Sequence, residues 1–132
     1  MKKVLLLAVL PILLCICCKK KECNEVSLTD YNSVGDWTCN ANNLTLKQYI
    51  GDTLKVYGWK WKYGFYLISD KDRQNERNAS AKGRSIYLKI EDYSLIPENP
   101  CDSMLFVTGI VQYYQEVFPG PFELYVTEIK KQ

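Results

Sequence analysis

The stretch that decides the fold runs from residue 53 to residue 63 and reads TLKVYGWKWKY. Leu54 and Val56 would point to one side of an extended chain, and the other side would carry four aromatic rings, those of Tyr57, Trp59, Trp61 and Tyr63. Alternation with a period of two is typical of a half-buried β-strand. Glycine inside such a strand marks a bulge or a sharp coil. We therefore expect a long strand that is bulged or sharply coiled at Gly58.

Further strand signals follow this stretch and a helical turn precedes it. Thr45 and Gln48 have the spacing of a capping box, and Gly51 suits the left-handed end of a short helical turn over residues 44–51. The later strands are expected at residues 65–69, 85–91, 104–115 and 122–130, the fourth strand being interrupted by Gly109. Residues 70–84 are charged and rich in Asn, which indicates a solvated loop, and residues 93–103 leave space for one turn of helix.

This order of strands resembles the OB-fold, a five-stranded, partly open Greek-key barrel. Residues 51–58 (GDTLKVYG), 106–111 (FVTGIV) and 122–129 (FELYVTEI) look like the first, fourth and fifth strands of the bacterial OB-fold proteins related to tRNA-anticodon-binding modules. The resemblance implies a mainly β domain with a small Greek-key OB-like barrel and a short helical turn before strand one. A small SH3-like barrel or another five-stranded meander is the alternative fold.

The composition limits the chemistry. The 132 residues fit one domain, and 17 Lys and Arg against 15 Asp and Glu are too evenly balanced to indicate nucleic-acid binding. Histidine is absent, which excludes a Ser–His–Asp hydrolase, a His-liganded zinc enzyme and a His-ligated haem carrier. Asp70, Asp72, Glu91 and Arg73 could be grouped as in a nuclease, but no spacing requires it and EF-hand spacing is missing. We expect no catalysis, no metal and no cofactor.

The first residues have the features of an export signal. Lys2 and Lys3 precede thirteen residues, 4–16, that are apolar apart from Cys15. A helix needs about 20 apolar residues to span a bilayer, so a secretory signal is favoured over a membrane span. The alternative of a buried N-terminal helix is disfavoured by Pro11 and by the lack of a polar face.

The end of this signal resembles that of a bacterial lipoprotein, in which a cysteine after a small residue becomes lipidated. Cys18 follows a small residue, so we expect lipidation at Cys18, with Cys17 as the alternative. The resemblance implies a signal peptide over 1–17, a tether and N-terminal extension over 18–43, and the barrel over 44–132. It also implies a covalent diacylglycerol and N-acyl anchor in the inner or outer membrane of a bacterial envelope, facing the periplasm or the cell surface.

Processing would change the charge of the protein and place its cysteines in an oxidising compartment. Cleavage before Cys18 removes two lysines and leaves fifteen basic against fifteen acidic residues; without the tether lysines 19–21 the remainder is twelve against fifteen. Three cysteines would remain beyond the anchor, enough for one disulfide and one free thiol. We slightly prefer Cys39–Cys101, with Cys23–Cys39 as the main alternative.

The OB-like face of strands two and three, flanked by the first and last hairpins, is where such barrels bind ligands. The aromatic candidates for that surface are Trp59, Trp61, Tyr63, Tyr66, Tyr113, Tyr114 and Phe118. Exposed rings of this kind can stack on a ligand, contributing about 1–3 kcal/mol per nucleobase. The competing interpretation is that these rings form the core, because a bulge at Gly58 would turn Trp59 and Trp61 inward.

These observations together indicate an envelope lipoprotein that acts as a non-catalytic binding or interaction module. The expected ligand is a saccharide, a peptide or a partner protein. The alternative is a structural accessory subunit of an envelope assembly; nucleic-acid binding and a cryptic enzyme are less favoured.

Overall fold

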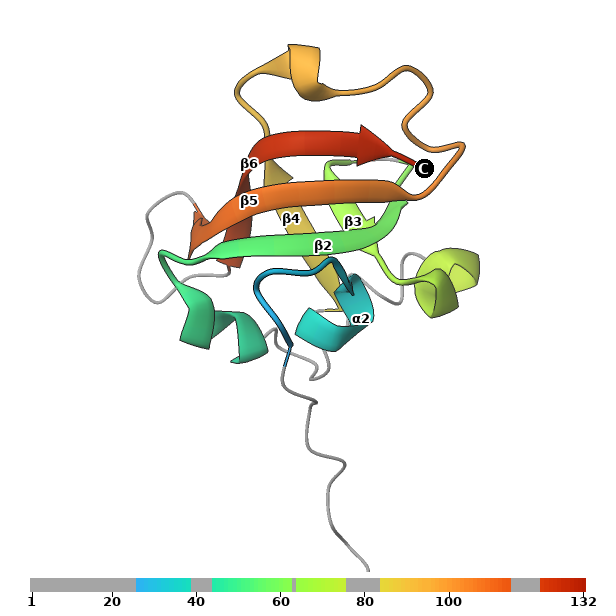
Figure 1. Cartoon of the computed structure of the whole chain (residues 1–132). Helices are drawn as coiled ribbons and strands as arrows, with labels where there is room; N and C mark the ends of the chain where they lie inside the picture. Colours follow the sequence, from blue (N-terminus) through green and yellow to red (C-terminus); the bar gives the residue numbers. More distant parts are fainter. Residues whose placement is uncertain (1–25, 39–43, 63, 76–83, 115–121) are drawn as a thin grey trace, which may run out of the picture.

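The structure is a computed structural model that describes residues 26–38, 44–62, 64–75, 84–114 and 122–132. Five strands close into a barrel in the order β2-β3-β4-β6-β5, with β2 pairing back to β5 (Figure 1). These strands are β2 (Thr53–Lys60), β3 (Tyr66–Ile68), β4 (Ser85–Lys89), β5 (Leu105–Tyr113) and β6 (Phe122–Lys131). Strands β4 and β6 run parallel and the other neighbours run antiparallel. The expected mainly β, five-stranded OB-like barrel is confirmed.

The helical turn expected before the first barrel strand is also confirmed. It is η2 (Leu44–Tyr49), a short 3-10 helix. The chain then turns at Gly51, whose φ of +87° is the left-handed conformation that glycine adopts without steric cost. The backbone N–H of Gly51 donates to the carbonyl of Val111, so the turn is fixed against β5 before β2 begins.

Gly58 is the point at which β2 changes partner, and it is not a bulge. The register with β5 is continuous from Thr53 to Gly58, and the pairing with β3 starts at Trp59. A Cβ at position 58 would lie 2.6 Å from the carbonyl oxygen of Ile68 and 3.0 Å from Val34 Cγ2. Only a residue without a side chain fits there, which permits the strong coiling that closes a small barrel.

The bulge lies at the second glycine. The register of β5 with β6 shifts between Thr108 and Gly109, so that Thr127 of β6 is the additional residue. A Cβ at position 109 would come within 2.6 Å of the carbonyl oxygen of Tyr125 and 2.7 Å of Leu124 Cγ. This bulge re-aims β6, which keeps both Leu124 and Val107 in the core on either side of it.

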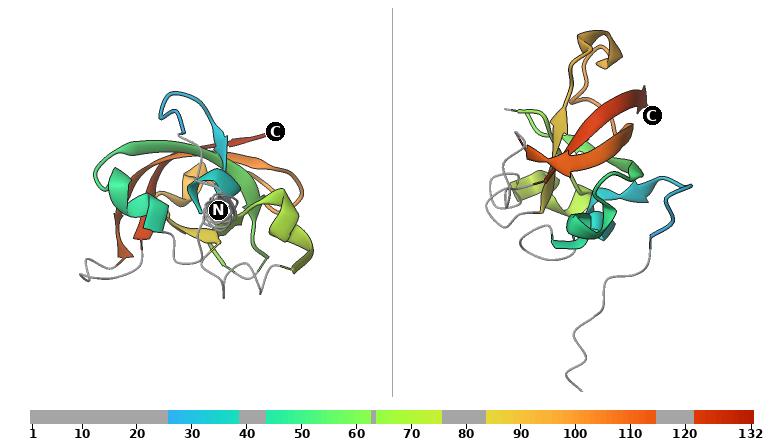
Figure 2. Two further views of the ribbon diagram at one scale, coloured as in Figure 1. Left: turned by 90° about the horizontal axis from the view of Figure 1, so that it is seen from below. Right: turned by 90° about the vertical axis from the view of Figure 1, so that its left-hand side faces the viewer.

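The N-terminal segment closes one end of the barrel. β1 (Asn32–Ser33) pairs in parallel with β2, and the next four residues form α2 (Val34–Trp37), which is capped by the Ser33 side chain. Seen from below, α2 lies inside the ring of strands (Figure 2). Val34 and Trp37 are fully buried in the core. Residues 31–38, which the sequence placed in a tether, are therefore part of the folded unit.

The core inside the ring is aliphatic apart from Trp37. Its barrel residues are Leu54, Val56, Leu67, Ile86, Leu88, Leu105, Val107, Val111, Leu124 and Val126, joined by Leu46 from η2. Because these positions alternate along each strand, the intervening side chains point outward. Tyr57, Trp59, Tyr66 and Tyr87 all occupy such outward positions and are half-buried. The interpretation of Trp59 as a core residue is therefore wrong.

Two connections contain short helical turns. The first is η3 (Asp70–Asn75), where only a solvated loop was expected; the second is η4 (Tyr93–Leu95), in the segment where one turn was expected. In η3 the Asp72 carboxylate is buried and accepts from Ser69 Oγ at 2.9 Å and from Arg84 at 2.6 Å. Across the described ranges, no helix has the length and apolar character to cross a membrane.

Candidate functional site

Four aromatic side chains, Trp61, Tyr66, Tyr87 and Tyr114, form a continuous row on the outside of the barrel, which we call the aromatic row. Trp61 lies 5.3 Å from Tyr66, Tyr66 lies 5.0 Å from Tyr87, and Tyr87 lies 5.0 Å from Tyr114, measured between ring centroids. Each ring meets the next in an edge-to-face arrangement, the geometry that the ring quadrupole favours. All four residues are half-buried. The row therefore presents partly exposed rings in fixed mutual positions.

The strand register explains why these rings meet. Tyr66 and Tyr87 are directly paired across β3 and β4. Trp61 is brought to Tyr66 because its backbone N–H donates to the Tyr66 carbonyl at 2.8 Å. Tyr114 follows directly after β5 and reaches Tyr87 from the side of the β5–β6 connection. The row thus crosses the outer face of β3 and β4, which lie behind β2 and β5 in Figure 1.

Two more rings form a separate pair, because Phe65 packs against the core and thus faces away from its neighbour Tyr66. Phe65 precedes β3 and lies 6.4 Å from Tyr93 of η4. Tyr93 is 68% exposed, the largest value among the exposed large hydrophobic residues of the described ranges. The ammonium of Lys60 lies 5.2 Å from the centre of the Phe65 ring and donates to the Trp61 carbonyl. This lysine is therefore held against the backbone at the start of the row.

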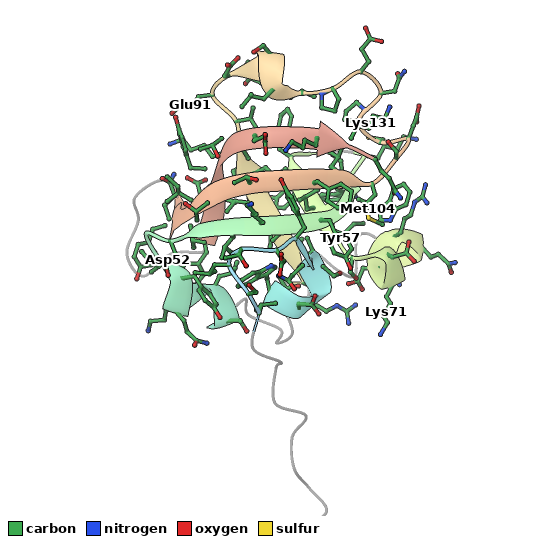
Figure 3. All side chains as sticks on the ribbon, in the orientation of Figure 1. Asp52, Tyr57, Lys71, Glu91, Met104 and Lys131 are labelled. Carbon is green, nitrogen blue, oxygen red and sulfur yellow. The ribbon has the colours of Figure 1, made fainter. Side chains whose placement is uncertain are left out.

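Trp59 is directed elsewhere, although the sequence placed it on one face with Trp61. Its indole N–H donates to Asp70 Oδ1 at 3.1 Å, and the guanidinium of Arg73 stacks 3.5 Å above its ring. Both partners belong to η3, whose Lys71 points away from the barrel (Figure 3). The change of partner at Gly58 turns the strand between Tyr57 and Trp61. Trp59 is therefore covered by η3 and separated from the aromatic row.

Tyr57 belongs to a third group of rings, on the outside of β2 and β5 (Figure 3). It lies 5.7 Å from Phe106, and Tyr31 of the N-terminal segment packs edge-on against Phe106 at 5.2 Å. The Tyr31 hydroxyl lies within hydrogen-bond distance of Thr108 and Glu128. The expectation that the aromatic side of β2 forms one surface is wrong, because the coil of the strand divides it into three.

The remaining ligand-binding residues predicted from the sequence do not belong to the aromatic row or lie outside the described residues. Tyr113 packs against Phe122 at 5.4 Å, and Phe122 in turn lies against the core, so this pair is separate from the row. Tyr63 and Phe118 lie outside the described residues, as do Cys17, Cys18, Cys23 and Cys39. Tyr87 was missed as a candidate, although its outward position in β4 was readable from the alternation of Ile86, Tyr87 and Leu88.

Burial and neighbouring carboxylates raise the pKa values of two outward-facing tyrosines, Tyr87 and Tyr125. The pKa of Tyr87 is raised, first by burial and then by the nearby groups Tyr114, Glu123, Tyr66 and Tyr93. The pKa of Tyr125 is also raised, because its hydroxyl donates to Glu91 at 3.0 Å and the carboxylate opposes ionisation. Glu91 in turn lies 3.9 Å from the ammonium of Lys89. Both phenols, Tyr87 and Tyr125, therefore stay protonated to a higher pH than a free tyrosine.

Neither a disulfide nor a metal site is found in the part of the chain that the structure describes. Cys101 is a half-buried free thiol, and the expected pairing with Cys39 stays a prediction because Cys39 lies outside the described ranges. Comparisons with protein-family models, with curated proteins and with solved structures gave no match.

Proposed function

We propose that this protein is a membrane-anchored envelope lipoprotein whose OB-like barrel binds a ligand, without catalysis, on the aromatic row. The observation that carries the binding part is the row itself. Four half-buried rings touch in sequence across β3 and β4; a backbone hydrogen bond joins Trp61 to Tyr66, and strand pairing joins Tyr66 to Tyr87. Rigid aromatic rings lose little conformational entropy on binding, which favours them at recognition surfaces.

The anchor rests on the sequence. Lys2 and Lys3, the apolar residues 4–16 and the cysteines at 17 and 18 support export followed by lipidation at Cys18. Two or more acyl chains would anchor the protein stably, since one chain alone binds a membrane only marginally. Mass spectrometry of the mature N-terminus tests this part. A peptide beginning at acylated Cys18 is expected, and an unmodified chain beginning at Met1 would contradict it.

The binding part is tested by titrating the protein with neutral oligosaccharides, short peptides and candidate envelope proteins while following tryptophan fluorescence. Trp61→Ala and Tyr66→Ala should each weaken the interaction of a ligand found in this way. Tyr57→Ala is the matched control, because it removes a half-buried tyrosine from the outside of β2 and β5. Equal affinities in all three variants would refute the aromatic row as the binding surface. Binding of a protein and of no small ligand would favour the structural accessory role.

A further inference from the structure

A buried carboxylate lies in line with the tyrosines of the aromatic row. Tyr66 pairs with Tyr87, Tyr87 pairs with Glu123 of β6, and Glu123 pairs with Gln112 of β5, so one register position crosses four strands. Leu124, the neighbour of Glu123, belongs to the core, and Glu123 therefore faces outward. Glu123 is nevertheless only 2% exposed. The carboxylate thus lies in the layer of the rings, beside Tyr87.

Glu123 has one side-chain partner among the described residues, and that partner is neutral. Gln112 Nε2 donates to Glu123 Oε1 at 2.6 Å. Lys89 pairs with Glu91, and Lys60 donates to a backbone carbonyl. Burying a carboxylate without a cationic partner costs free energy, and a glutamine would fill the same volume at lower cost. The position therefore holds a carboxyl group where a neutral side chain of the same shape would serve the fold.

The rings beside Glu123 are themselves able to attract cations. The face of an aromatic ring is the negative end of its quadrupole and attracts cations within about 6 Å of the ring centre. Successive rings of the row are inclined by 65°, 65° and 81°, so their faces point in different directions. A flat platform would suit a planar base or a sugar ring, whereas inclined rings beside a carboxylate suit a compact positive charge.

We propose that the aromatic row and Glu123 together bind a cationic group of the ligand. The group is an ammonium, either the side chain of a lysine in a peptide or a quaternary ammonium on a small molecule or headgroup. It would lie on the face of Tyr87 or a neighbouring ring, with the Glu123 carboxylate behind the ring supplying the balancing charge. This inference rests on the proposed function of the row and specifies the chemistry of its ligand.

The test compares charged probes with uncharged probes of the same shape on the full-length protein. N-acetyl-lysine N-methylamide is paired with N-acetyl-norleucine N-methylamide, and choline is paired with 3,3-dimethylbutan-1-ol. Both charged probes, or one of them, should bind at least about tenfold more tightly than the uncharged partner, the size expected for a charge pair of low exposure. Which charged probe binds more tightly distinguishes a peptide source from a quaternary ammonium source.

Glu123→Gln preserves the shape of the side chain and should reduce the affinity for the charged probe about tenfold while leaving the uncharged probe unaffected. The matched control is Glu98→Gln, which removes the same charge from an exposed position whose carboxylate has no bond among the described residues. Thermal unfolding of both variants shows whether they are folded. If Glu123→Gln does not fold, the comparison of charged with uncharged probes on the wild-type protein tests by itself whether the row binds a cationic group.

Equal affinity for charged and uncharged probes, or an affinity unchanged by Glu123→Gln, would overturn the cation inference. If Trp61→Ala and Tyr66→Ala still weaken such charge-independent binding, the aromatic row remains the binding surface and only its ligand chemistry is wrong. If no variant of the row changes any binding, the proposed function fails as well.

Discussion

At the scale of single residues, two glycines decide the shape of the barrel. Gly58 lies where the carbonyl of Ile68 and the methyl of Val34 leave no space for a side chain. Gly109 occupies the equivalent position against Tyr125 and Leu124, at the bulge. Each is a site of close approach between backbone and neighbours, which is why β2 can coil from one partner to the next and β6 can be re-aimed.

Gly58→Ala should destabilise the protein by about 1–3 kcal/mol, because the new methyl group overpacks a site with a fixed backbone carbonyl. Gly35→Ala is the control. Its Cβ would lie 3.5 Å from the nearest atom, an ordinary contact, and alanine is the better helix former within α2. Urea unfolding of both variants measures the difference. A loss of stability in Gly35→Ala equal to that in Gly58→Ala would contradict the steric explanation.

The raised pKa of Tyr87 should make the stability of the protein depend on pH in the alkaline range. Because its pKa is raised above the ordinary value of 10.0, the folded protein holds the phenolic proton more tightly than the unfolded chain. The associated stabilisation is fully present below pH 10.0 and decreases as the pH rises through that value toward the folded pKa.

The stability measured by urea unfolding should therefore fall above this pH, and Tyr87→Phe should make the fall shallower. Tyrosinate absorbance at increasing pH should likewise lose a late-titrating phase in this variant. Identical alkaline slopes for wild type and Tyr87→Phe would contradict the assignment.

At the scale of elements, the short helix α2 covers one end of the barrel core. It lies between β1 and η2 in the chain and buries Val34 and Trp37 completely. Trp37 packs edge-on against Tyr49 of η2 with the ring centroids 4.9 Å apart. Four residues of helix have little stability in isolation, so α2 is held by its tertiary contacts and by the Ser33 cap.

Trp37→Ala should cost about 3–5 kcal/mol, the range for removing a fully buried large aromatic side chain. Trp37→Phe retains an aromatic ring at this position and should cost less. Denaturant unfolding followed by far-ultraviolet circular dichroism measures both, since this signal does not depend on the tryptophan that is removed. A cost below about 1 kcal/mol for Trp37→Ala, as is typical of surface positions, would show that α2 is not part of the core.

At the scale of the whole molecule, the aromatic row and the N-terminal segment occupy different sides of the barrel. Tyr31 lies against Phe106, Thr108 and Glu128 on the outside of β5 and β6. The row crosses β3 and β4, the strands behind β2 and β5 in Figure 1. In the closed order β2-β3-β4-β6-β5, the strand of Tyr87, β4, is separated from the pair β2–β5 by β3 on one side and by β6 on the other. We therefore expect the middle of the row, at Tyr87, to remain accessible in a protein anchored through its N-terminus.

Acrylamide quenching of tryptophan fluorescence should accordingly be the same for the lipidated protein on vesicles and for the form without its anchor. Trp61 and Trp59 are the half-exposed tryptophans, and Trp37 is fully buried, so the signal reports on the row and on η3. Vesicles of phosphatidylethanolamine and phosphatidylglycerol avoid a choline headgroup that could occupy the row. Weaker quenching after anchoring would mean that the membrane covers this side of the barrel.

The sequence by itself was sufficient for the strands, their inward faces, the turn at Gly51 and the aromatic character of the surface. These features depend on local patterns, namely the period-two alternation of Leu54, Val56 and their successors, the capping spacing and the glycines. The basic start, the apolar residues 4–16 and the cysteines at 17 and 18 predict the export signal and its lipidation site, which lie outside the described residues.

Tertiary structure alone decided which rings meet. Tyr57, Trp59 and Trp61 are equivalent in the alternation of the sequence, but the coil at Gly58 directs them to three different partners, which are Phe106, the helical turn η3 and Tyr66. The role of residues 31–38 and the place of Glu123 beside Tyr87 likewise depend on pairings between distant segments. The physical reason is that a local pattern fixes which face a side chain takes on its own strand, whereas the closure of the barrel fixes what lies opposite that face.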